Sequence, residues 1–75
     1  NIFLILKIIN DNTNNSHGIG RTQLIYKLKE KGIKISDSRI RILLECLEKN
    51  NYIEINRGRI GNVITEKGID YLTNL

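Results

Sequence analysis

Residues 35–53 read ISDSRIRILLECLEKNNYI, and this stretch decides the fold. Its large apolar residues recur at the i, i+3, i+4, i+7 spacing that gives a helix one buried face. They are Ile40, Leu43, Leu44 and Leu47. Ser36 can accept an unpaired backbone N–H at the helix start, and Asn51 suits the left-handed position after the helix end. The stretch therefore predicts a helix over residues 37–50 with an apolar inner face and a polar outer face.

A second helix is predicted just before this one, over residues 21–31. Leu24, Ile25 and Leu28 form its inner face, and Gly32 stands where a left-handed residue ends a helix. Only a brief connector separates the two helices. Such a pair is a helix-turn-helix.

The chain begins with an almost uninterrupted apolar run, IFLILKII at residues 2–9. The β-branched isoleucines also suit a strand, but the polar turn residues that follow favour a helix over residues 2–10. Residues 10–18 are polar and are expected to form a loop. Gly18-Ile19-Gly20 lacks the third glycine and preceding strand of a dinucleotide fingerprint, so it is interpreted as a turn.

Residues 52–64 predict a β-hairpin. Tyr52-Ile53-Glu54-Ile55-Asn56 partly alternates, residues 57–61 read RGRIG, and a second short strand follows. After the hairpin, Thr65 can cap a last helix over residues 66–74. Gly68 inside that helix is unfavourable by roughly 1 kcal/mol relative to Ala, which suggests close backbone packing there.

The chain has 75 residues, enough for a single domain over residues 1–75, and a formal net charge of +4. Residues 21–59 hold ten Lys and Arg against five Asp and Glu, so the positive charge is concentrated in the middle of the chain. One basic face suits a nucleic-acid partner, although a Lys-rich solvated surface would give the same count. No apolar run approaches the roughly 18 residues of a membrane span, and no signal peptide is visible, so we expect a cytoplasmic protein.

Catalytic, metal and cofactor sites are not expected. The single cysteine, Cys46, excludes an internal disulfide framework and a cysteine-based metal cage. His17 has no second ligand at metal-binding spacing. The sequence offers no Ser/His/Asp set and no paired acids in a plausible cleft, so we expect no enzyme activity.

Two segments carry a family resemblance: Ser36–Ile53, and Ile64–Leu72, which reads ITEKGIDYL. They resemble the recognition helix, first wing strand and post-wing segment of winged-helix repressors. The nearest variety is the winged-helix domain of ribonuclease R and of archaeal nitrogen-regulation repressors. The resemblance implies a mainly α-helical, α+β fold: a winged helix-turn-helix of three helices, a two-stranded wing and a C-terminal helix. We also expect a protein of a prokaryotic or archaeal cell with an AT-rich genome.

The resemblance further implies binding of double-stranded DNA, with the helix over 37–50 in the major groove and residues 57–61 on the backbone or in the minor groove. The outer face of that helix carries five candidate DNA contacts: Ser38, Arg39, Arg41, Ile42 and Glu45. Arg57 and Arg59 at the hairpin tip can reach a phosphate or a narrow minor groove. Arg21 and Thr22 can hold a phosphate at a helix N-terminus.

A different class of function stays open. Winged helices also serve as protein-interaction modules or as RNA-binding accessories in larger assemblies, and Ile42 and Cys46 lie where relatives often carry polar residues. The first helix is apolar on nearly every side, so we expect part of it to bury against a second copy or a further domain. The expected contacts are Phe3, Leu4, Ile8, Tyr71 and Leu75.

Overall fold

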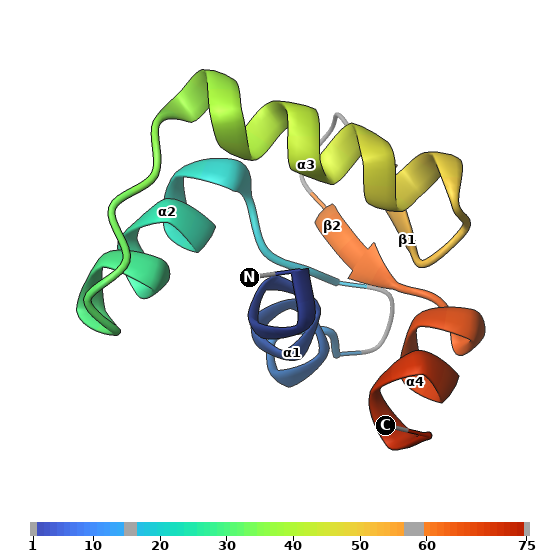
Figure 1. The fold of residues 1–75 in the computed structure, drawn as a ribbon. Helices are drawn as coiled ribbons and strands as arrows, with labels where there is room; N and C mark the ends of the chain where they lie inside the picture. The colour runs from blue at the N-terminus through green and yellow to red at the C-terminus, as the bar shows by residue number, and fades with distance from the viewer. Residues whose placement is uncertain (1, 15–16, 57–59, 75) are drawn as a thin grey trace.

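The computed structural model describes residues 2–14, 17–56 and 60–74. Within these residues the order of elements is α1 (Ile2–Asp11), α2 (Arg21–Glu30), α3 (Asp37–Lys49), β1 (Ile53–Asn56), β2 (Gly61–Ile64) and α4 (Glu66–Thr73). The two strands pair antiparallel, with Ile53 opposite Ile64 and Asn56 opposite Gly61. Figure 1 shows α3 lying across α1 and α2, with the hairpin beside its C-terminal half. The predicted fold class is confirmed.

The helix ends follow the local rules that predicted them. The Ser36 hydroxyl accepts the Arg39 N–H at 3.2 Å, and the Thr65 hydroxyl accepts the Gly68 N–H at 3.1 Å. Asn51 closes α3 with a φ of 66° in the left-handed region. These caps satisfy backbone groups that the helices themselves leave unpaired, so α3 and α4 begin at the predicted residues.

The packing at Gly68 also agrees with the prediction. A β-carbon there would overlap the backbone carbonyl of Tyr52, so only glycine lets α4 approach the start of the hairpin this closely. The Thr65 hydroxyl donates to the Asn51 carbonyl at 2.6 Å, and the Thr65 N–H donates to the Tyr52 carbonyl at 3.1 Å. The end of α3, the start of β1 and the start of α4 therefore form one junction.

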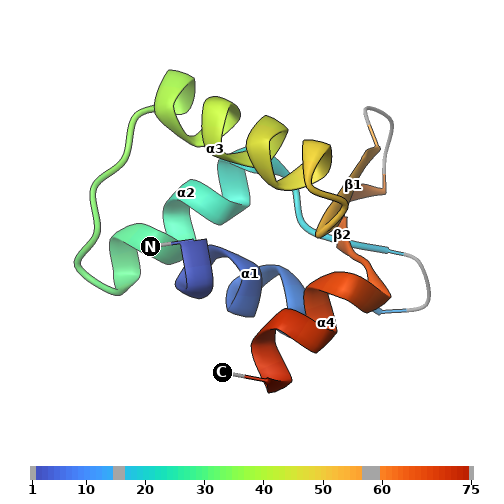
Figure 2. The same ribbon diagram turned by 45° about the vertical axis from the view of Figure 1, so that its right-hand side comes forward.

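Helix α1 lies at the centre of the core and packs against α2, α4 and β2. In Figure 2 it lies beneath α3, with α4 alongside it. It contributes four residues to a cluster of twelve buried apolar side chains: Ile5, Leu6, Ile8, Ile9, Ile19, Leu24, Leu28, Ile40, Leu44, Leu47, Ile53 and Ile64. Three neighbours cover it at once, which explains why its sequence is apolar on nearly every side.

The interpretation of residues 18–20 as a turn is wrong. This segment is extended and pairs antiparallel with strand β2 of the hairpin, through an isolated bridge between Ile19 and Asn62. Ile19 and Asn62 exchange two backbone hydrogen bonds of 3.1 and 2.8 Å, and the Gly18 N–H donates to the Ile60 carbonyl at 2.7 Å. The sequence offered no local signal for this pairing, because the partner strand lies more than forty residues further along the chain.

Candidate nucleic-acid interface

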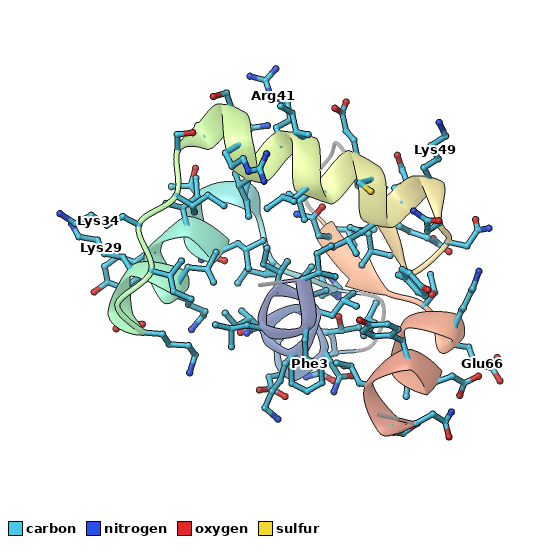
Figure 3. All side chains as sticks on the ribbon, viewed as in Figure 1. Phe3, Lys29, Lys34, Arg41, Lys49 and Glu66 are labelled. Atoms are coloured by element: carbon cyan, nitrogen blue, oxygen red, sulfur yellow. The ribbon has the colours of Figure 1, made fainter. Side chains whose placement is uncertain are left out.

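The outer face of α3 is free of intramolecular packing. Ile40, Leu44 and Leu47 point into the core, while the predicted contact residues Ser38, Arg39, Arg41, Ile42 and Glu45 are all exposed. Ile42 is 58% exposed, an unusual position for a large apolar side chain. Figure 3 shows Arg41 and Lys49 extending outward from α3, away from the body of the domain. The structure thus brings the five predicted α3 residues to one surface.

One side of this surface continues into an open groove of about 490 Å³ between α3, the start of α2 and the hairpin. Its lining combines two arginines, one carboxylate, two side-chain amides, two apolar side chains and two glycines. These residues are Gly20, Arg21, Arg41, Leu44, Glu45, Ile55, Asn56, Gly61 and Asn62. The two arginines in this lining can pair with phosphate oxygens.

Sequence reasoning missed the strand side of the groove. Asn56 and Asn62 lie within or at the end of strands, and nothing local distinguishes them from ordinary hairpin residues. Asn62 is buried, with 4% of its surface exposed, and its Nδ2 donates to the Ile19 carbonyl at 2.9 Å. Its Oδ1 has no hydrogen-bond donor in the described part of the chain. Asn62 therefore ties the segment before α2 to the hairpin and fixes one wall of the groove.

Two polar contacts hold the other elements around α3. The Ile55 N–H donates to Oε2 of Glu48 at 3.3 Å, which joins β1 to α3. Nε of Arg21 lies 2.6 Å from Oδ1 of Asp37, which joins the start of α2 to the start of α3. The second carboxylate oxygen of Asp37 lies 3.8 Å from Nη2 of Arg41. Asp37 thus bridges two predicted DNA contacts.

The start of α2 keeps features of an anion site. Gly20 is the N-cap residue, with an extended backbone, and no side chain of the described residues caps the helix. Arg21 and Thr22 are exposed there. The first N–H groups of a helix attract phosphate through hydrogen bonding and the helix dipole. Because Arg21 already pairs with Asp37, a phosphate would have to share or replace that carboxylate.

The remaining predicted contacts fall into two groups. Arg57, Arg59 and Leu75 lie outside the described residues. Of the predicted dimer contacts, Phe3 is 43% exposed, and Leu4 and Tyr71 are half-buried. Figure 3 shows Phe3 on the side of the domain opposite Arg41.

The expectation that Ile8 contacts a second copy is wrong. Its side chain is 5% exposed and lies in the core of this chain. The expectation assumed that a small domain covers only one face of α1, whereas α2, α4 and β2 surround it.

The part of the chain that the structure describes holds no group of three or more His, Cys, Asp or Glu side chains arranged to bind a metal ion. No helix in it is both long enough and apolar enough to cross a bilayer. Cys46 is an exposed free thiol on α3.

A helix-turn-helix followed by an antiparallel hairpin, with the second helix exposed beside the hairpin, defines a winged-helix domain. The sequence matches the family model of the ribonuclease R winged-helix domain over residues 3–72, and the chain belongs to this family. A search of curated proteins gave no match.

Proposed function

We propose that this domain binds double-stranded DNA sequence-specifically, as the DNA-binding part of a transcriptional regulator. The observation that carries the proposal is the exposed outer face of α3, where Ser38, Arg39, Arg41, Ile42 and Glu45 lie together. At 1.5 Å per residue the 13 residues of α3 span about 20 Å, and the major groove admits a helix of this kind.

Arg39 and Arg41 lie at different positions on α3, which suggests that they make different contacts with DNA. Arg39 lies in the first turn of the helix, at the end that usually enters the groove, and pairs with no carboxylate among the described residues. We assign it to a guanine edge, where a guanidinium can donate to O6 and N7 together. Arg41 borders the groove beside the hairpin and is assigned to the backbone, which sets register and affinity.

An accessory role in a larger assembly is the second candidate. The family takes its name from the winged-helix domain of a ribonuclease, which favours RNA as a partner. The 58% exposure of Ile42 beside exposed Cys46 favours contact with an apolar protein surface. In the DNA proposal, Ile42 instead contacts a thymine methyl group.

Selection of bound sequences from a random duplex pool at moderate salt tests the proposal. We expect a recurring motif containing at least one guanine. Arg39→Ala should lose preference for it, whereas Lys7→Ala, which removes one exposed positive charge from α1, should retain it. Equal binding of all duplexes, or preference for RNA added in competition, would favour the accessory role. Binding that does not weaken with salt would indicate an apolar protein contact.

A further inference from the structure

Asp37 occupies an unusual position between two arginines of the candidate interface. Its Oδ1 lies 2.6 Å from Arg21 Nε, and its Oδ2 lies 3.8 Å from Arg41 Nη2. The two arginines come from different helices and both border the groove beside the hairpin. One carboxylate therefore holds two cations close together, where they would otherwise repel each other.

The fold does not depend on this cluster. The side chains of Arg21, Asp37 and Arg41 are 44%, 52% and 56% exposed, and ion pairs this accessible to water add little to stability. The start of α3 is capped by Ser36, and the buried side chains of α2 and α3 lie in the common core. The cluster therefore calls for a different explanation.

Competition between Asp37 and a bound phosphate for the two arginines supplies an explanation for the cluster. A phosphate that enters the groove meets Arg21 and Arg41 already partnered, so it gains their attraction only by displacing Asp37. A carboxylate and a phosphate present similar oxygen acceptors to a guanidinium. Every duplex that brings a phosphate into the groove meets this competition, because the sugar-phosphate backbone is the same whatever the base sequence.

We propose that Asp37 is a positioning residue that limits affinity for DNA. It holds Arg21 and Arg41 at the groove and competes with backbone phosphates for them, which lowers affinity for preferred and arbitrary duplexes alike. This proposal rests on the proposed function, since it assumes that the groove receives a DNA backbone. Asp37 itself contacts no base.

Asp37→Asn tests the proposal by removing the charge and retaining the shape. On a random-sequence duplex we expect the plot of log affinity against log salt to steepen by up to about 0.9, one counterion. If affinities converge near 1 M salt, this corresponds to about eight-fold tighter binding at 0.1 M. The preferred site should gain by a similar factor, so the ratio of specific to non-specific affinity should stay close to that of wild type. Asp37→Glu should restore the wild-type slope.

Asp70→Asn is the matched control. Asp70 is an exposed acid on α4, so its substitution changes net charge equally and leaves Arg21 and Arg41 untouched. In the free protein, the Arg21 Nε–H resonance should be shifted and protected in wild type and in the Asp70 variant, but not in Asp37→Asn. Thermal unfolding should show all three variants folded.

The outcomes separate the two proposals. If wild-type protein binds no duplex at any salt, the proposed function fails and this inference fails with it. If wild type prefers its site but Asp37→Asn behaves like wild type or like Asp70→Asn, DNA binding stands and the role of Asp37 is overturned. A steeper salt dependence and tighter binding on both kinds of duplex, seen only with Asp37→Asn, support the inference.

Discussion

Gly18 lies so close to the backbone carbonyl of Asn62 that a β-carbon at position 18 would overlap it. The close approach is what lets the segment before α2 pair with the hairpin. Gly61, with a φ of 80°, faces the same segment from the other side, and a β-carbon there would lie 2.8 Å from the Ile19 carbonyl. Two glycines far apart in sequence thus allow these two backbone segments to pair closely.

Gly18→Ala should therefore destabilise the domain. Forcing a methyl group against a backbone oxygen costs about 1–3 kcal/mol. In a domain of this size each kcal/mol lowers the melting temperature by about 4–8 °C. Gly20→Ala is the control, because a β-carbon there meets nothing within 4 Å and the residue has an extended backbone. Equal melting temperatures for the two variants would contradict the close approach.

Arg39→Ala and Arg41→Ala should affect DNA binding in different ways. Loss of a guanine contact at Arg39 should cost about 1–3 kcal/mol on the preferred site and relax choice at one base pair. Loss of Arg41 should weaken all duplexes evenly and flatten the salt dependence. Titration against a set of single-base variants of the preferred site distinguishes the two patterns. Profiles identical to wild type for both variants would remove α3 from the interface.

Arg57 and Arg59, predicted from sequence at the hairpin tip, should act as cations on the backbone. Replacing both with Ala should weaken specific and random duplexes together and flatten the log–log salt plot by up to about two units. Insertion into the minor groove would instead give a selective loss on A·T-rich flanks, where that groove is narrow. Titrations on both kinds of flank over a series of salt concentrations check this. An unchanged slope and affinity would favour the protein-interaction role.

We also propose that the domain self-associates through the exposed apolar residues of α1 and α4. Ile2, Phe3 and Ile69 are 37%, 43% and 41% exposed, and Phe3 lies on the side opposite Arg41 (Figure 3), which leaves α3 free for DNA. A two-fold dimer would favour palindromic half-sites one helical turn, about 34–36 Å, apart. Sedimentation at tens of micromolar should show a dimer that Phe3→Ser weakens. Tyr26→Ser, at a 63% exposed position on α2, should not weaken it. A strict monomer would contradict the proposal.

The parts of the fold that sequence could predict are those governed by neighbours in the chain. Ser36, Thr65 and Asn51 act through hydrogen bonds or backbone angles within a few residues, so the helix ends were predictable. The apolar spacing in α3 likewise predicted its exposed face.

The groove was not predictable, because it depends on contacts between distant residues. The Arg21–Asp37 pair joins residues sixteen apart, and the Ile19–Asn62 bridge joins residues forty-three apart. Apolar residues show which side chains are buried but not how many neighbours bury them, which explains the error at Ile8.

The pairing of residues 18–20 with β2 has a consequence for the thermodynamics of binding. Arg21 follows that segment directly, so the backbone hydrogen bonds between Ile19 and Asn62 connect the start of α2 to the hairpin. The two walls of the groove are therefore already spaced in the unbound domain. A ligand that fits this spacing need not order the protein as it binds, so the protein loses little conformational entropy on binding. Such preorganisation favours tight binding from a small contact surface, which is the surface a 75-residue chain can offer.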